Sequence, residues 1–298
     1  MADPILLYGV GATKAGTSWL YRMLHDRPDC HVHPVKETHY WDSAEARQLE
    51  WQVAANERTK EKLRQTRVEA ILSSNEKRAA NLSRRIAALE TLNFMLVQDR
   101  RGHAAYRTYL KLNAPAESKV IGEICPAYSL LPVETYAQMA ALAPDTRFLY
   151  LLRDPLSRLW SAVRMHAVRS QKPGQDLQMR SNQILRAIVL KDKHPQITNR
   201  GDYAEILPRL KAGVPNGALR IMHFDDLLTD AGFGALCDWL EISRGEVKAD
   251  NKVHAGVSLE MNPELRQQAL SMLRPQYEAV AEHLGCLPAR WVEVLENA

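Results

Sequence analysis

Short apolar runs alternate with longer amphipathic stretches along most of the chain. The first run, residues 5–10, reads ILLYGV and is typical of a buried parallel strand. Four later runs predict further strands at 30–33, 119–124, 147–152 and 219–224. Helical patterns separate these runs. The alternation predicts an α/β fold with a mainly parallel sheet flanked by helices, and it places ligand sites at the carboxyl ends of the strands.

One long region departs from this alternation. Residues 43–113 are rich in Glu, Lys, Arg, Gln and Ala, and Leu82, Ile86 and Leu89 recur at helical spacing without any strand pattern. We therefore predict a helical insertion at about 43–113 within a single domain that spans 1–298. The insertion is either a set of two or three surface helices or a lid that forms a wall of an acceptor site.

Composition limits the class of protein and its partners. Hydrophobic residues make up 46% and charged residues 25%, which is ordinary for a soluble globular chain. The net charge of +4 suits an anionic ligand better than it suits nucleic acid, so no nucleic-acid partner is expected. The chain shows neither a signal-peptide pattern nor an apolar run long enough to span a membrane. These features predict a cytoplasmic protein without a transmembrane segment.

The cysteines predict neither a disulfide framework nor a metal centre. The chain has four, Cys30, Cys125, Cys237 and Cys286, and no two of them form a CxxC pair. We therefore expect buried free thiols and no metal site.

The first strand runs into a loop that resembles a phosphate cradle. Residues 8–19 read YGVGATKAGTSW, in which Thr17 or Ser18 is predicted to cap the following helix. In the loop that binds nucleotide triphosphates, GxxxxGK[ST], the lysine follows a glycine, whereas here Lys14 precedes Gly16. The dinucleotide pattern GxGxxG fits only in part. The loop therefore predicts an anion site that differs from both.

A second stretch predicts a second anion site. Residues 148–166 read FLYLLRDPLSRLWSAVRMH, with Asp154 as the expected cap and Pro155 at the first helical position. Arg153 then lies at the end of a strand, and Ser161 lies on the helix that follows. A charged donor and a hydroxyl so placed can hold a phosphate. Two such sites predict a ligand that is phosphorylated at two places.

Together these stretches resemble two motifs of the sulfotransferases that use 3'-phosphoadenosine 5'-phosphosulfate (PAPS). TKAGTSWL is similar to the family's 5'-phosphosulfate loop, and RDPLSRLWSAVRMH is similar to its 3'-phosphate motif. The resemblance implies a P-loop-like fold, PAPS as the donor and adenosine 3',5'-bisphosphate (PAP) as the product, without a metal. It assigns cofactor contacts to Lys14, Ala15, Gly16, Thr17, Ser18, Trp19, Arg153 and Ser161.

Further segments resemble the heparan sulfate branch of that family. VKETHYWD, at 35–42, is similar to a segment in which a glutamate is the catalytic base, a role that would fall on Glu37. GEICPAYSLLP and RGDYAEILPRL are also similar, and NKVHAG implies cofactor contacts from Lys252, Val253 and His254. The chain lacks the Golgi-type anchor, the disulfide hairpin and the Lys-Gly-Arg run of that branch. A bacterial cytosolic enzyme is therefore expected.

The resemblance also suggests how sulfuryl transfer would be catalysed. Lys14 would stabilise charge on the leaving 5'-phosphate, and Glu37 would take the proton of an acceptor hydroxyl or amine during an in-line transfer. His39 would assist the base, bind the acceptor or pack as a structural histidine, and Lys36 would position sulfate oxygens. Three other residues, Glu123, Tyr128 and Tyr203, either line the acceptor pocket or pack in the core.

Several alternatives stay open from the sequence. The acceptor is a small molecule, a glycan or a lipid, and the oligomeric state is undetermined. A P-loop kinase and a non-catalytic protein that binds PAPS or PAP are the rival functions.

Overall fold

The protein is built around a five-stranded parallel sheet with the strand order β2-β3-β1-β4-β5. A computed structural model describes residues 3–245, 247 and 258–296. The strands are β1 (Ile5–Gly11), β2 (Cys30–Val32), β3 (Val120–Ile124), β4 (Thr146–Leu152) and β5 (Leu219–His223). All five strands predicted from the sequence are therefore present, and the α/β class is confirmed.

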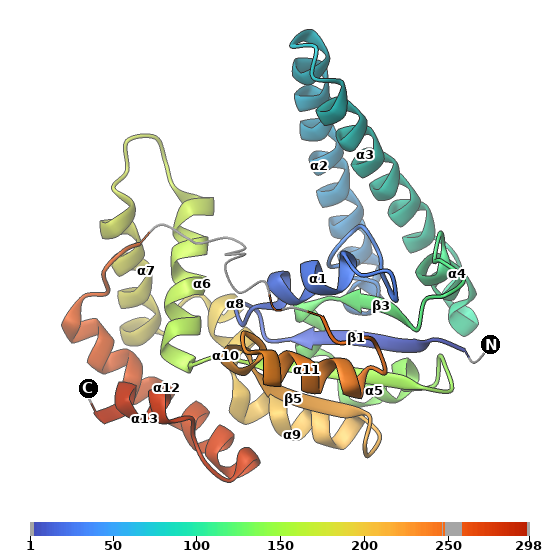
Figure 1. The fold of residues 1–298 in the computed structure, drawn as a ribbon. Coiled ribbons are helices and arrows are strands. Elements are labelled where there is room, and N and C mark those ends of the chain that lie inside the picture. The colour runs from blue at the N-terminus through green and yellow to red at the C-terminus, as the bar shows by residue number, and fades with distance from the viewer. Residues whose placement is uncertain (1–2, 246, 248–257, 297–298) are drawn as a thin grey trace.

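Helices join the strands and cover the sheet, with α1 above it and α9 below it in the view of Figure 1. In the first half of the chain they are α1 (Thr17–His25), α2 (Ala46–Leu72), α3 (Glu76–Leu96), α4 (Ala104–Lys111) and α5 (Val133–Ala140). In the second half they are α6 (Pro155–Ser170), α7 (Leu177–Lys191), α8 (Pro195–Thr198), α9 (Tyr203–Gly213), α10 (Phe224–Leu227), α11 (Asp230–Trp239), α12 (Pro263–Leu284) and α13 (Ala289–Glu296).

The centre of the sheet forms the core. All seven residues of β1 are buried, and β1 lies between β3 and β4. A strand that is flanked on both sides and covered on both faces must be apolar at every position, which explains its unbroken apolar run. Because the sheet is parallel, the loops after β1, β2, β3 and β4 emerge at one edge. That edge carries the predicted site residues.

The region 43–113 contains α2, α3 and α4 and no strand, as predicted. Helices α2 and α3 form a long hairpin that projects away from the sheet (Figure 1). Its interior is partly polar, since Asn56 donates to Asn93 across the two helices at 2.7 Å. Helix α4 joins the hairpin to the body of the protein and buries Tyr106 and Tyr109.

The two predicted helix starts have different outcomes. The carboxylate of Asp154 accepts a hydrogen bond from the Ser157 amide at 2.7 Å, so the predicted cap of α6 is confirmed. The predicted cap of α1 is wrong. Gly16 is the cap residue, its left-handed φ of 86° turns the loop into the helix, and no side chain caps it. Across the residues that the structure describes, no helix is both long and apolar enough to cross a membrane.

Candidate active site

The loop between β1 and α1 presents backbone donors at the edge of the sheet. Because no side chain caps α1, the amides of Thr17 and Ser18 in its first turn are not used by a cap. Gly16 is required here for two reasons. Its φ is left-handed, and a Cβ atom would lie 2.0 Å from the ring of Phe224. The loop therefore has the form of an anion cradle at a helix N-terminus.

Arg153 brings the second predicted motif to this loop. It follows β4, and its Nη1 donates to the carbonyl oxygen of Lys14 at 3.1 Å. Tyr203 fixes the backbone of Arg153, since its hydroxyl donates to the Arg153 carbonyl at 2.9 Å. The half-buried Ser161 lies two turns into α6. The structure thus brings Lys14 and Arg153 together, although they are 139 residues apart.

Lys14 lies in a strongly positive region. Burial lowers its pKa, and the charges of Arg153, Arg169 and Arg164 lower it further, whereas Glu37 opposes the shift. Arg164 and Arg169, both on α6, were not predicted from the sequence as site residues. Cations gathered around a helix start favour a ligand with several negative charges.

Glu37 and His39 lie on the loop that follows β2. The Glu37 side chain is 40% exposed and pairs with Lys36. Its burial raises its pKa, but the charge and hydrogen bond of Lys36, together with His39, outweigh this effect and leave the pKa below its usual value. The carboxylate is therefore ionised at neutral pH and can accept a proton.

His39 is held between two acids. Its Nδ1 lies 2.9 Å from an oxygen of Asp42, and its Nε2 lies 3.9 Å from an oxygen of Glu37. Burial lowers the pKa of His39, but its hydrogen bond with Asp42 and the negative charges around it raise the pKa overall. His39 is thus placed beside the predicted base, and Asp42, three residues further along, orients its ring.

Glu123 and Tyr128 belong to a buried hydrogen-bond network and do not line an open pocket. Tyr128 donates to Glu123 at 2.7 Å, and Thr38 and Tyr106 also donate to this carboxyl group. All four are nearly inaccessible to solvent. Thr38 was not predicted from the sequence as a site residue, yet it lies between Glu37 and His39 and connects their loop to β3.

The other predicted cofactor contacts are either buried in the core or lie outside the described residues. The side chain of Trp19 is 4% exposed and packs edge-on against Phe224 and Phe233 in the core, which gives no support to a ligand contact. Ala15 is also buried. Lys252, Val253 and His254 lie outside the described residues.

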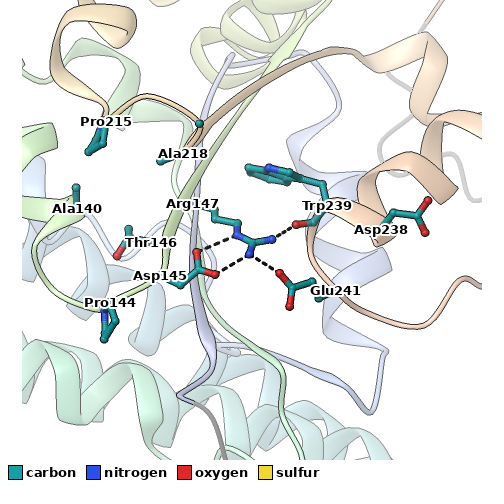
Figure 2. A pocket seen from close by; sticks show the side chains of 11 residues that line it. Ala140, Pro144, Asp145, Thr146, Arg147, Pro215, Ala218, Asp238, Trp239 and Glu241 are labelled. Atoms are coloured by element: carbon teal, nitrogen blue, oxygen red, sulfur yellow. Dashed lines mark hydrogen bonds and ion pairs between the residues drawn. The ribbon is translucent and has the colours of Figure 1, made fainter.

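A separate pocket of about 550 Å³ lies at the opposite edge of the sheet (Figure 2). Arg147, near the start of β4, crosses it and donates to Asp145, to Glu241 and to the carbonyl of Trp239. Its charge is therefore already paired. Because the ligands of parallel sheets bind at the carboxyl ends of the strands, Lys14 and Arg153 remain the candidate active site.

Comparison with known proteins agrees with this fold. A solved structure, a sulfotransferase from Alicyclobacillus acidocaldarius, superposes with a TM-score of 0.60 at 20% identity, covering 98% of this chain and 99% of that one. The sulfotransferase domain from the curacin biosynthetic pathway gives a TM-score of 0.39 at 15% identity, covering 92% and 99%. No curated protein matches the sequence. The sulfotransferase family model matches residues 5–244, so the chain belongs to the sulfotransferase family.

Proposed function

We propose that this protein transfers a sulfuryl group from PAPS to a hydroxyl or amine of an acceptor, with Glu37 as the base. The observation that carries the proposal is the meeting of the two predicted anion-binding motifs, where Arg153 donates to the Lys14 carbonyl beside the start of α1, which no side chain caps. Two loops with several cations around them suit a ligand that is phosphorylated at two places.

The residues present fit such a donor. PAPS supplies an activated sulfuryl group on its 5'-phosphate and carries a second phosphate on the ribose. Lys14 and the amides of Thr17 and Ser18 would meet the negative charge that grows on the departing 5'-phosphate. Arg153 and Ser161 would bind the 3'-phosphate.

Glu37 would take the acceptor proton. The acceptor atom forms its bond to sulfur as the bond between sulfur and the phosphate oxygen breaks, and the electron pair stays on the phosphate. Glu37 is ionised because Lys36 and His39 lower its pKa, so it accepts the proton that the acceptor releases. His39 is hydrogen-bonded to Asp42 through Nδ1. Its other ring nitrogen, Nε2, faces Glu37 and can carry a proton there.

Ligand-induced thermal stabilisation tests the donor. We predict that PAP raises the melting temperature and that ATP with Mg²⁺ does not. Lys14→Ala and Arg153→Ala should remove this shift, whereas Arg101→Ala, at a side chain that is 92% exposed, should retain it. Stabilisation by ATP with Mg²⁺ alone would point to a kinase and contradict the proposal.

Transfer of label from radioactive PAPS to a panel of alcohols, phenols, amines, sugars and lipids tests the reaction. Glu37→Gln should keep the PAP-induced shift and lose roughly a hundredfold or more of the transfer rate, as expected for removal of a general base. A fully active Glu37→Gln variant would exclude Glu37 as the base. PAP binding without transfer to any acceptor in the panel would favour the non-catalytic alternative.

A further inference from the structure

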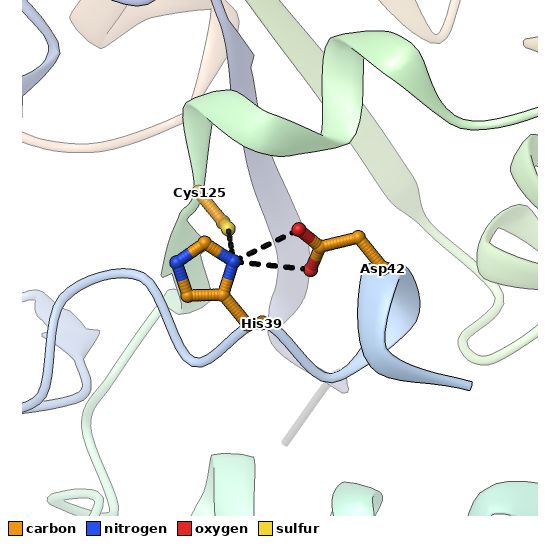
Figure 3. A group of neighbouring side chains, drawn as sticks. All are labelled: His39, Asp42 and Cys125. Carbon is orange, nitrogen blue, oxygen red and sulfur yellow. Dashed lines mark hydrogen bonds and ion pairs between the residues drawn. The ribbon is translucent and has the colours of Figure 1, made fainter. Parts of the chain in front are cut away.

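Three side chains that commonly bind transition metals converge in Figure 3, and one of them, His39, lies beside the predicted base Glu37. His39 Nδ1 lies 2.9 Å from Asp42 Oδ2 and 3.9 Å from Cys125 Sγ. One ligand atom from each of the three residues lies within 4.8 Å of those of the other two. The sequence predicted no metal site because Cys125 is 86 residues from His39 and belongs to no CxxC pair.

The fold holds these atoms together from two neighbouring strands. His39 has a left-handed φ of 57°, which turns the chain into the short 3-10 helix Trp41–Ser43 that carries Asp42. Cys125 directly follows β3, the strand beside β2. Its side chain is fully buried, whereas those of His39 and Asp42 are 20% and 26% exposed. An ion could therefore reach the group from the side of His39 and Asp42.

The surroundings favour a cation. Burial raises the pKa of the Cys125 thiol well above its usual value, and the charges of Asp42, Glu123 and Glu37 raise it further. Burial is the largest of these causes and disfavours any lone charge. What favours a cation is the position of the Asp42 and Glu37 carboxylates on the two sides of His39, and a bound divalent ion would allow the thiol to lose its proton to solvent.

The spacing suits tetrahedral zinc. Bonds of about 2.0 Å to nitrogen and oxygen and about 2.3 Å to sulfur separate N from O by about 3.3 Å and N from S by about 3.5 Å. The observed N–O and N–S separations are 2.9 and 3.9 Å, and the oxygen and sulfur atoms lie within 4.8 Å of each other. Small rotations of the side chains would bring the three atoms to the distances that the ion requires. We propose that His39, Asp42 and Cys125 bind one Zn²⁺, with a fourth position open, and that the bound ion inhibits the enzyme.

We expect inhibition because the ion would coordinate Nδ1 of His39. Coordination at Nδ1 leaves the ring proton on Nε2, which faces Glu37 at 3.9 Å. Carboxylates commonly accept this second proton of a metal-bound histidine. Without the ion the His39 ring can turn away and release its proton, whereas a metal-bound ring is fixed and would hold Glu37 in this hydrogen bond, so Glu37 would accept the acceptor proton more slowly. The inhibition rests on the proposed function, but the binding does not.

Titration with Co²⁺ alone, after treatment with a chelator, tests the binding independently of any activity. We expect one equivalent to produce a thiolate-to-cobalt absorption in the near ultraviolet, and Zn²⁺ to abolish it. Cys125→Ser and Asp42→Asn should each weaken Co²⁺ binding at least tenfold. Cys286→Ser, at an exposed cysteine, is the matched control and should behave as the parent protein.

Several results would overturn the binding proposal. These are the absence of the absorption in the parent protein, its persistence in both Cys125→Ser and Asp42→Asn, and its loss in Cys286→Ser. Circular dichroism establishes that each variant is folded. If Cys125→Ser does not fold, Asp42→Asn decides the question, because Asp42 lies nearer the surface.

The rate of sulfuryl transfer with and without Zn²⁺ tests the inhibition. We expect Zn²⁺ to reduce the rate, a chelator to restore it, and Cys125→Ser to need at least tenfold more Zn²⁺. A parent protein that binds Zn²⁺ stoichiometrically yet keeps its full transfer rate would overturn the inhibition. If the protein transferred no sulfuryl group at all, the proposed function would fail while the cobalt titration would still decide the binding.

Discussion

Three of the predicted catalytic residues have a backbone conformation that side chains rarely adopt. The φ values of Lys14, Glu37 and His39 are 72°, 63° and 57°. Such conformations persist only where the surroundings hold them, and they are often found at functional sites. Thr38 supplies this support between Glu37 and His39, since it is fully buried and donates to the equally buried Glu123.

Removing the hydroxyl group of Thr38 tests whether this residue holds the Glu37 and His39 loop in place. In Thr38→Val the shape is kept, but Glu123 loses a buried donor, so we expect a loss of about 1–3 kcal/mol in the free energy of unfolding. The PAP-induced thermal shift should remain, whereas transfer should slow by roughly tenfold to a hundredfold because Glu37 and His39 are no longer fixed. Thr59→Val, which removes an exposed hydroxyl on α2, is the control. A Thr38→Val variant with the parent's transfer rate would contradict this role of Thr38.

The role of a residue could be predicted from the sequence where the motif that contains it is local. It could not be predicted where the role depends on a contact with a distant part of the chain. Glu37 and His39 were identified because they lie in one segment that resembles a known family. Thr38 lies in the same segment, yet its role depends on Glu123, 85 residues away. No pattern in a single sequence reports that β3 runs beside β2.

At the scale of elements, packing determines the cap residue of α1 more strongly than the preference for a hydroxyl side chain at that position. Hydroxyl residues favour the cap position, so Thr17 or Ser18 was the expected cap. Gly16 occupies it instead, because Phe224 approaches so closely that no Cβ atom fits. Phe224 begins α10, which follows β5, and this approach could not be predicted from the loop sequence. The strands were predictable because their apolar runs are short and bounded, and Asp154 was predictable because Pro155 follows it.

Gly16→Ala should damage both stability and ligand binding. The left-handed φ costs about 1 kcal/mol for alanine, and the overlap with Phe224 adds to this cost. We expect a melting temperature several degrees lower and a smaller PAP-induced shift, because the first-turn amides move. Gly174→Ala is the matched control, since Gly174 also has a positive φ of 75° but a Cβ atom added there would meet no atom within 4 Å. Equal effects of the two substitutions on stability and on PAP binding would exclude a role for the Phe224 contact.

At the scale of the whole molecule, the helical insertion is attached to the sheet through aromatic contacts beside the candidate active site. Tyr40 stacks on Tyr106 of α4 at 4.1 Å, and His33, just after β2, stacks on Tyr109 of α4 at 3.9 Å. The same helix also carries one of the donors to Glu123. The insertion was predictable as helical from its spacing, but its attachment behind the Glu37 loop was not, since the contacts join segments more than 60 residues apart.

This attachment makes the stability of the protein depend on pH. The Tyr109 hydroxyl lies 2.7 Å from Nδ1 of His33, whose side chain is buried. Burial lowers the pKa of His33 to about 3, and the nearby His31 and His25 lower it as well. The ordinary pKa of the unfolded chain is 6.5, so between these two values the unfolded state binds the extra proton. Stability from this group is complete above pH 6.5 and is lost progressively as the pH falls toward 3.

We therefore predict that the free energy of unfolding of His33→Gln depends less steeply on pH below pH 6.5 than that of the parent protein. Glutamine can still accept from Tyr109 but takes up no proton, so the contribution of His33, up to about 1.4 kcal/mol per pH unit, disappears within this window. Urea unfolding of both proteins at intervals between pH 7 and pH 4 measures the two slopes. The variant should be less stable than the parent at pH 7, and this difference should shrink on acidification. Parallel profiles would show that His33 does not couple the attachment of α4 to protonation.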